Sequence, residues 1–355
     1  MYLMKTINVL ITGGGSPGIA GTIYSLKNNY DNRKINIICT DAQAECTGKF
    51  LADKFYQIPR AENESNYLNK MFQICEIENV DIILPQNTSE LILLSHNTDK
   101  FLKLGTKIII TDSKTISIAN NKYELLNICK NNNIPYPEYS LVDNKDDLIQ
   151  VAKEMGWPKL ALVVKLPDSN GSRGIRIIDE QKDYQSLFYN EKPTSLFTKL
   201  DNFLDILDDT STPLLIMEYL PGSEVSIDVF RDNNNFISIP RVRNKIRSGI
   251  SFSNSAIQDA QLIEYSQKIA DKLDLKFCFG FQFKYDVNNV PKILECNPRV
   301  QGTMVFSTIM GANLIYSSIK SCLEEEIPDF VLNWEAKLLR YWGAIGISDK
   351  NITKI

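Results

Sequence analysis

Short apolar runs and longer helical segments alternate along the first 112 residues of the chain. The runs are rich in Ile, Val and Leu, which favours buried strands at 6–12, 35–40, 80–85 and 107–111. Segments with a helical spacing of apolar positions lie between them, at 19–29, 65–79 and 88–104. This alternation predicts an α/β fold with a parallel, doubly wound sheet, in which ligands bind at the carboxyl ends of the strands.

The second part of the chain changes to hairpins and longer strands. Residues 160–179, LALVVKLPDSNGSRGIRIID, are expected to form strand, glycine-rich loop and strand. Lys165 ends the first strand, and the loop contains Gly171, Ser172 and Gly174. Backbone N–H groups and cations of this kind can surround a phosphate chain. An ordinary flexible hairpin is the alternative at this point.

Further strands are expected at 214–230, at 237–247 and in the two segments FGFQFKYD and KILECN. Helices are expected at 113–133, 144–156, within 181–207, at 258–275 and at 303–325. Strand 237–247 places four cations at every second position: Arg241, Arg243, Lys245 and Arg247. Like charges on one face repel unless an anion or acidic side chains lie against them. The acids could come from the alternating face of strand 224–230, which carries Glu224, Ser226 and Asp228.

Three oxygen-bearing side chains lie on the last two predicted strands. Glu295 and Asn297 are two residues apart and therefore share a face, and Gln282 lies on the preceding strand. Such a set, completed by phosphate and water, is typical of Mg²⁺ bound beside ATP. A polar strand edge is the alternative.

Composition excludes several classes of function. The chain has 355 residues, 43% of them hydrophobic, and a net charge of −4, which gives no electrostatic argument for nucleic acid or an anionic membrane. It has a single histidine, which disfavours histidine metal sites and Ser/His/Asp catalysis. Seven cysteines without a CxxC pair, and no signal-peptide pattern or long apolar span, predict a cytoplasmic protein outside the membrane.

A glycine run after the first strand leaves a second interpretation open. Gly13, Gly14, Gly15 and Gly18, with Asp41 further on, loosely fit a dinucleotide-binding loop. Pro17 lies inside the loop, and no reductase pattern of Tyr and Lys follows. Binding of NAD(P), binding of another anion, and a structural turn all remain as alternatives.

Four motifs in a fixed order give the chain a resemblance to a known family. They are VVKLPDSNGSRGI, IMEYLPGSEVSIDVF, FQFKYD and KILECNPRVQGT. Together they resemble the ATP-grasp superfamily, and within it the synthetase units of the carbamoyl phosphate synthetase large subunit. The resemblance implies an α/β and α+β chain with three parts: a Rossmann-like pre-ATP-grasp domain at 1–112, an N-terminal ATP-grasp part with the lid at 113–220, and a C-terminal ATP-grasp part with the metal and phosphate site at 221–355.

The resemblance also implies a role for each matching residue. Residues expected to bind ATP are Lys122, Lys165, Gly171, Ser172 and Gly174 at the phosphates, Glu218, Tyr219 and Leu220 at the adenine, and Glu224 at the ribose. Gln282, Glu295 and Asn297 would hold Mg²⁺ or Mn²⁺, and Gln282 stands where many relatives have an acid. Arg299 and one of Arg241 or Arg243 would stabilise the transferring phosphoryl group and the substrate carboxylate.

The implied activity is that of a ligase that joins a small carboxylic acid to an amine through an acyl phosphate. Two other functions stay open: an NAD(P)-dependent oxidoreductase, and a catalytically silent ATP-binding regulator. Carbamoyl phosphate synthesis itself is not expected, since that enzyme uses two tandem units. A homodimer is expected by analogy only, and the sequence does not identify the substrates.

Overall fold

The computed structural model describes residues 4–169, 173–191, 195–208, 212–341, 343–348 and 351–354. The chain divides into two compact units. The first unit comprises residues 1–120, 225–282 and 296–355, and the second comprises 121–224 and 283–295. The chain therefore changes unit within single strands as well as in loops. The division into three functional parts at 112 and 220 remains a prediction, because compactness alone does not assign a role.

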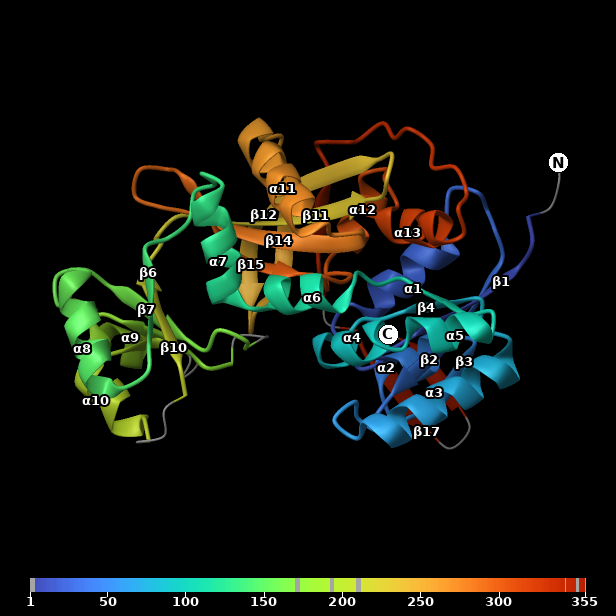
Figure 1. Ribbon diagram of the computed structural model, residues 1–355, viewed down its shortest axis with the longest axis horizontal. Coiled ribbons are helices and arrows are strands. Elements are labelled where there is room, and N and C mark those ends of the chain that lie inside the picture. Colours follow the sequence, from blue (N-terminus) through green and yellow to red (C-terminus); the bar gives the residue numbers. More distant parts are fainter. Residues whose placement is uncertain are drawn as a thin grey trace. The chain divides into compact units, whose positions relative to one another are not determined.

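A five-stranded parallel sheet begins the first unit (Figure 1), and it confirms the predicted α/β fold. Its order is β3-β2-β1-β4-β5, with bounds Lys54–Gln57, Ile35–Asp41, Ile7–Ile11, Ile82–Leu84 and Lys107–Ile108. The order reverses between β1 and β4, which is where ligands bind in folds of this type. The edge strand β3 was not predicted, because its KFYQ sequence has no buried apolar run.

Both faces of this sheet are buried, which explains the uninterrupted apolar runs. Val9 and Ile11 of β1 join a core that contains α1 (Ile19–Lys27), α12 (Val305–Ile309) and α13 (Leu314–Cys322). Leu10 joins a second core with α3 (Glu64–Glu78), α4 (Thr88–Ser95) and α5 (Thr98–Lys103). Alternate residues of one strand therefore pack into different layers.

The glycine run at 13–18 is folded tightly onto its neighbours. Gly13 has φ +66°, and the Gly14 N–H donates to the Thr40 carbonyl at 2.9 Å. Asp41 accepts from the N–H of Gly15 at 2.7 Å and from that of Gln43 at 2.8 Å. Each carboxylate oxygen of Asp41 thus accepts a backbone N–H of a local turn, which agrees with the structural-turn interpretation.

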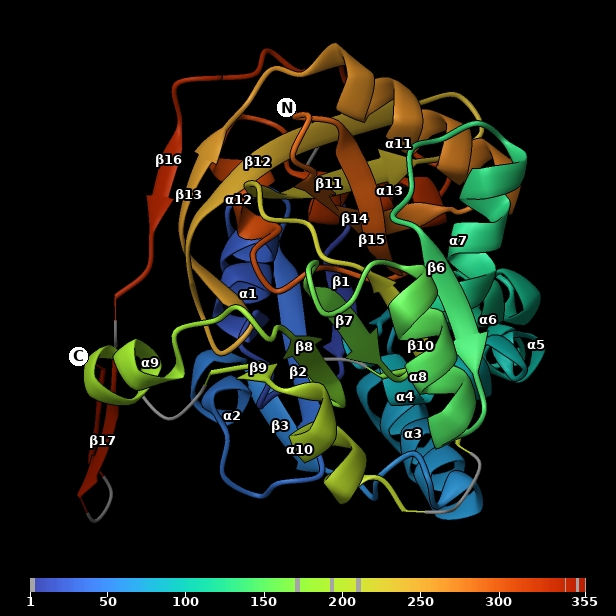
Figure 2. The same ribbon diagram turned by 90° about the vertical axis from the view of Figure 1, so that its left-hand side faces the viewer.

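A six-stranded sheet forms a second layer of strands (Figure 2). Its order is β15-β14-β11-β12-β13-β16, with bounds Pro291–Asn297, Phe277–Tyr285, Glu224–Arg231, Phe236–Arg247, Ile250–Ala256 and Lys337–Leu339. The chain passes from one compact unit to the other within β14 and within β15. Strands β17 (Ile345–Ser348) and β18 (Asn351–Lys354) form a separate hairpin.

The second unit contains a five-stranded sheet in the order β6-β10-β7-β8-β9. The strand bounds are Tyr139–Val142, Leu214–Glu218, Leu162–Lys165, Ile175–Ile178 and Phe197–Thr198. Antiparallel pairing of β7 with β8 confirms the predicted hairpin around the glycine-rich loop. Helices α8 (Lys145–Glu154) and α10 (Leu200–Ile206) pack against this sheet, and α9 (Tyr184–Asn190) follows β8.

Two predicted helices are each divided by an asparagine. Segment 88–104 divides at Asn97 into α4 and α5, and segment 113–133 divides at Asn121 into α6 (Ser113–Asn120) and α7 (Lys122–Asn131). The Asn121 side chain accepts from the Glu124 N–H at 3.0 Å, which begins a new helix. Other helices are confirmed near their predicted positions, including α11 at Ala260–Leu273, and the short α2 at Thr47–Leu51 is an addition.

Among the described residues no helix is both long enough and apolar enough to cross a membrane.

The contact between the glycine run and the 299–303 loop gives a test of the fold. A Cβ added at Gly18 would lie 2.7 Å from the Cα of Gly302, so backbone would have to move. A Cβ added at Gly302 would have its nearest neighbour at 3.9 Å. We expect Gly18→Ala to lower the free energy of unfolding by about 1–3 kcal/mol and Gly302→Ala to change it by less than about 1 kcal/mol. Equal losses in urea unfolding would contradict this close approach.

Candidate functional site

Two buried lysines form the core of the site in the second unit. Lys165 ends β7, where it pairs with Leu215 of β10 and Ile175 of β8. Lys122 is the first residue of α7. Both side chains are only 6% exposed, which is rare for lysine. The structure therefore brings together the two lysines that the sequence predicts at a phosphate chain.

The two ammonium groups have different surroundings. The Lys122 Nζ donates to the carbonyls of Ser169 and Pro167, and its backbone N–H donates to the Pro167 carbonyl at 3.0 Å. Lys122 thereby holds the first half of the glycine-rich loop. Lys165 has no hydrogen-bond acceptor or ion pair among the described residues. A buried ammonium without a partner costs free energy until an anion arrives.

Burial lowers the pKa of both lysines. For Lys165, burial is the main cause and the charge of Lys122 adds to it, so that its pKa falls to about 7. The carboxylates of Glu295 and Glu224 act in the opposite direction on Lys165. Burial also lowers the pKa of Lys122, partly offset by Glu295 and Asp168. The two acids beside the lysines, Glu224 and Glu295, are both residues that the sequence assigns to the site.

Only part of the glycine-rich loop belongs to the described structure. Gly171 and Ser172 lie outside the described residues. Gly174 has φ +61°, and a Cβ there would meet the Leu166 side chain at 2.7 Å. Its carbonyl accepts from the Leu166 N–H at 3.0 Å, which closes the hairpin next to Lys165. Gly174 is thus required by the backbone of the loop, independently of any ligand.

The predicted adenine segment is held by an ion pair that the sequence did not indicate. Lys292 Nζ lies 2.7 and 2.9 Å from the two carboxylate oxygens of Glu218, and 3.3 Å from Asp286. The Glu218 side chain is therefore engaged within the protein, and its backbone N–H donates to the Glu138 carbonyl at 2.9 Å. Leu220 is buried, and the ring of Tyr219 lies 6.3 Å from that of Phe197.

Arg241 lies in the first unit and is buried in a polar network. It is 2% exposed and contacts Asp228, which is 0% exposed, through two hydrogen bonds of 3.0 and 3.2 Å. Its other N–H groups donate to Asn254 at 2.8 Å and Gln301 at 3.1 Å. The pairing of β12 cations with β11 acids, the structural alternative from the sequence, is confirmed at this position.

Arg243 has a different position on the same strand. It is half-buried and donates to Ser251 Oγ at 2.7 Å and to Gln282 Oε1 at 3.1 Å. A β-bulge follows it, because the register of β12 against β13 shifts between Arg243 and Lys245. The bulge ends the regular alternation, and Lys245 and Arg247 are exposed. The four cations therefore do not form one functional face, and Arg243 is the more accessible of the two predicted arginines.

The end of β15 carries the remaining predicted residues. Asn297 follows Glu295 by two positions on this strand, so that the two side chains share a face. Asn297 Oδ1 accepts from Arg299 Nη2 at 3.2 Å, and Arg299 Nε donates to Thr88 Oγ1 at 3.1 Å. Thr88 begins α4 beside β4, so Arg299 reaches the carboxyl edge of the parallel sheet. The contact with Thr88 joins residues 211 positions apart and has no signal in the sequence.

Metal binding by these residues remains a prediction. Among the described residues, no cluster of three His, Cys, Asp or Glu side chains is arranged to hold a metal ion. The predicted set contains one carboxylate, Glu295, with two amides, Gln282 and Asn297. The amide oxygens of Gln282 and Asn297 each accept from an arginine, and each has a second lone pair for a cation.

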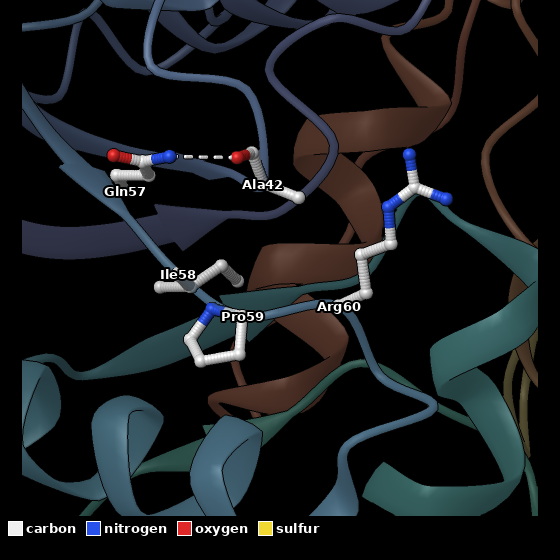
Figure 3. Close-up of a pocket in the computed structure, with 5 residues that line it drawn as sticks. All are labelled: Ala42, Gln57, Ile58, Pro59 and Arg60. Atoms are coloured by element: carbon white, nitrogen blue, oxygen red, sulfur yellow. Dashed lines mark hydrogen bonds between the residues drawn. The ribbon is translucent and has the colours of Figure 1, made fainter.

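A separate surface pocket lies at the carboxyl ends of β2 and β3 (Figure 3). It has a volume of about 390 Å³ and is lined by Ala42, Gln57, Ile58, Pro59 and Arg60. Gln57 Nε2 donates to the Ala42 carbonyl at 2.9 Å across it (Figure 3). None of the predicted site residues lines this pocket, although it lies at the edge of the sheet where ligands were expected.

The low pKa of Lys165 predicts how stability depends on pH. An unfolded lysine has a pKa near 10.4, so the folded state binds fewer protons between about pH 7 and pH 10. The free energy of unfolding contributed by this residue therefore rises with pH through that window. We expect Lys165→Met to be more stable than the natural chain at pH 7 by at least about 1 kcal/mol, with the difference shrinking toward pH 10. The exposed Lys153→Met is the control, and a pH-independent difference for Lys165→Met in urea unfolding would contradict the assignment.

The Arg241 network predicts a second contrast. Arg241→Met leaves Asp228 buried without its partner, and we expect a loss of about 3–5 kcal/mol in the free energy of unfolding. The double variant Arg241→Met/Asp228→Leu should recover most of that loss. Arg243→Met should cost less than about 1 kcal/mol, since Arg243 is half-buried. Chemical denaturation measures all three, and an unchanged midpoint for Arg241→Met would show that the network does not stabilise the fold.

Relatives among known proteins share both sequence and fold with the chain. The carbamoyl phosphate synthase large chain of Clostridium acetobutylicum is 24% identical over 296 residues, which cover 80% of this chain and 25% of that protein. The arginine-specific large chain of Bacillus subtilis is 24% identical over 278 residues, which cover 75% of this chain and 24% of that protein. The chain thus spans about a quarter of the length of these curated relatives.

A solved structure with the same fold comes from an enzyme of a different name. N5-carboxyaminoimidazole synthetase from Staphylococcus aureus, complexed with ADP, matches with a TM-score of 0.67 at 19% identity, over 94% of this chain and 82% of that chain. At this identity the match shows the fold alone.

Two family models match separate parts of the sequence. Residues 9–109 match the PylC-like N-terminal domain, and residues 210–338 match the family described as ATP-grasp in the biosynthetic pathway with Ter operon. The order of the two agrees with the order of motifs read from the sequence. The predicted resemblance is confirmed: part of the chain matches an ATP-grasp family model, and the chain is homologous to carbamoyl phosphate synthase large chains.

Proposed function

We propose that the chain is an ATP- and Mg²⁺-dependent ligase that joins a small carboxylic acid to an amine through an acyl phosphate. The observation that carries this proposal is the buried lysine pair, Lys122 and Lys165. Lys165 has no partner among the described residues, and its pKa is lowered to about 7. An arrangement that destabilises the folded protein is retained where it serves a ligand. Phosphate oxygens would accept hydrogen bonds from both ammonium groups and stabilise the protonated form of each lysine.

The surroundings of the pair fit a nucleotide rather than a single phosphate. The Glu218–Leu220 segment begins at the end of β10, the strand paired with β7, and the charge of Glu224 acts on Lys165. We assign the segment to the adenine and Glu224 to the ribose. The Glu218 carboxylate is bound to Lys292, so adenine recognition falls to the backbone of this segment. Gln282, Glu295 and Asn297 would hold Mg²⁺ or Mn²⁺, which when bound neutralises charge on the phosphates.

The arginines are assigned to the acid substrate and the transferring group. Arg243 and Arg299 present guanidinium groups, which suit bidentate binding of carboxylate or phosphoryl oxygens. Arg241 is omitted from this role, since it is 2% exposed and pairs with the fully buried Asp228. The hydrogen bond from Arg299 to Thr88 supports binding of the acid near the carboxyl edge of the parallel sheet.

The proposed reaction balances without a protein nucleophile. A carboxylate oxygen of the acid attacks the γ-phosphorus of ATP. The bond between the γ-phosphorus and the oxygen that bridges to the β-phosphate breaks, and ADP leaves. The amine nitrogen then attacks the acyl carbon, phosphate leaves with the carbon–oxygen electron pair, and the nitrogen loses a proton. The residues of the site bind, orient and neutralise charge in both steps.

Two further features of the proposal come from general arguments. All seven cysteines are free and buried, which favours a reducing compartment such as the cytoplasm. A homodimer is proposed by analogy with relatives, and no described residue is assigned to its interface. The proposed partners are a small-molecule acid and an amine, and the proposal includes no binding of nucleic acid or membrane.

A test of the proposal measures ADP and phosphate release with a panel of carboxylic acids crossed with amines. We expect one combination to release ADP with Mg²⁺, and Lys165→Met or Glu295→Gln to reduce its rate by about 100-fold or more, while the exposed Lys153→Met keeps it. ATP binding without ADP release across the panel would favour the silent regulator. Binding of NAD(P) but not ATP would favour the oxidoreductase.

A further inference from the structure

Lys284 is a cation at the nucleotide end of the second unit that has no role in the proposed reaction. It is the penultimate residue of β14, two positions after Gln282, and it is only partly exposed. Its Nζ lies 5.2 Å from the centroid of the Tyr219 ring. The lysine therefore lies against the segment that we assign to the adenine.

Backbone hydrogen bonds also place Lys284 beside Glu224. The Tyr285 N–H donates to the Ser223 carbonyl at 3.1 Å, and the Gly222 N–H donates to the Tyr285 carbonyl at 2.9 Å. Strand β11 begins at Glu224, one residue after Ser223, and Lys284 precedes Tyr285 on the antiparallel neighbour. Glu224 and Lys284 are consequently neighbours across the strand pair.

This placement depends on a glycine. A Cβ at Gly222 would lie 2.6 Å from the Tyr285 carbonyl oxygen and 2.7 Å from the Tyr285 Cβ. Any side chain at Gly222 would separate the turn after Tyr219 from β14. The absence of one lets Tyr219, Glu224 and Lys284 lie within one small region.

The charge on Lys284 is only partly compensated. Burial lowers its pKa, and the carboxylate of Glu224 offsets part of that cost. Among the described residues, the Lys284 Nζ has no hydrogen-bond acceptor and no ion pair. Its three N–H donors are therefore available to water or to a bound ligand.

We propose that Lys284 and Glu224 recognise the ribose together. Lys284 donates a hydrogen bond to the oxygen of the 2′-hydroxyl, and Glu224 accepts a hydrogen bond from the same hydroxyl. A hydroxyl both donates and accepts, so an ammonium and a carboxylate side by side match it, whereas a 2′-deoxyribose offers Lys284 no acceptor at this position. Lys284 then selects ribonucleotides over 2′-deoxyribonucleotides. This inference rests on the proposed ATP site.

A structural role for Lys284 has a different signature. A lysine that only covers the Tyr219 ring contributes a modest cation–π attraction, and its loss would weaken ATP and 2′-deoxy-ATP equally. A contact with the adenine would do the same, because both nucleotides carry that base. Only a contact with the 2′-hydroxyl changes the ratio of the two affinities.

The test is calorimetric binding of ATP and 2′-deoxy-ATP, each with Mg²⁺ and without acid substrate. We expect the natural chain to bind ATP about 10-fold or more tightly than 2′-deoxy-ATP, which corresponds to one hydrogen bond to a charged group. In Lys284→Met the ratio should fall to within about 3-fold, with the affinity for 2′-deoxy-ATP nearly unchanged. Lys284→Arg should restore most of the preference.

The matched control is Lys199→Met, which removes an exposed lysine of the same unit that lies 5.8 Å from the Tyr184 ring. This variant should keep the natural ratio. A preference retained in Lys284→Met, an equal loss for both nucleotides, or no preference in the natural chain would each overturn the inference while leaving the ATP site intact. Absence of ATP binding by the natural chain would overturn the proposed function and the inference with it. If a thermal melt shows that Lys284→Met does not fold, the ratio of the affinities for ATP and 2′-deoxy-ATP is measured in Lys284→Gln instead, with the same expected result.

Discussion

The site depends on two like charges held in the interior of the second unit. Lys122 and Lys165 repel each other, and burial removes the water that would stabilise them. Local structure makes the arrangement tolerable: the Asn121 cap starts α7 at Lys122, and the β7–β8 hairpin fixes Lys165. The carboxylates of Glu224 and Glu295 recover part of the cost. We propose that a bound anion removes the free-energy cost that remains.

The six-stranded sheet separates structural charge from charge that is available for function. Arg241 and Asp228 satisfy each other in the interior, where either group alone would be strongly destabilising. Two residues along β12, Arg243 is half-buried and contacts Gln282, and the bulge that follows turns the strand's remaining cations toward solvent. One strand thus supplies both a stabilising network and an arginine for the proposed chemistry.

Features that depend on local sequence could be predicted, and those that depend on distant partners could not. The parallel strands, the glycine hairpin and the ordered motifs each lie in short segments, and the structure or the comparisons confirm them. Asparagine caps at 97 and 121 were visible signals for dividing two helices, because Asn favours the start of a helix. Alternation placed Arg241 and Arg243 on one face but could not give their different burial. That difference arises from β13, a strand that was not expected, and from the register shift against it. The pairing of Lys292 with Glu218, and the contact of Arg299 with Thr88, join residues 74 and 211 positions apart.

The central claim is that the lysine pair forms an anion site that is prepared before the ligand binds. NMR titration of the Lys165 side chain, assigned by comparison with Lys165→Met, tests it directly. Without nucleotide the account predicts a pKa of about 7, and with saturating MgADP a pKa raised by about 2 units or more, because phosphate stabilises the charged form. A pKa near 10.4 in the nucleotide-free protein, or a value that does not move when MgADP is added, would contradict it.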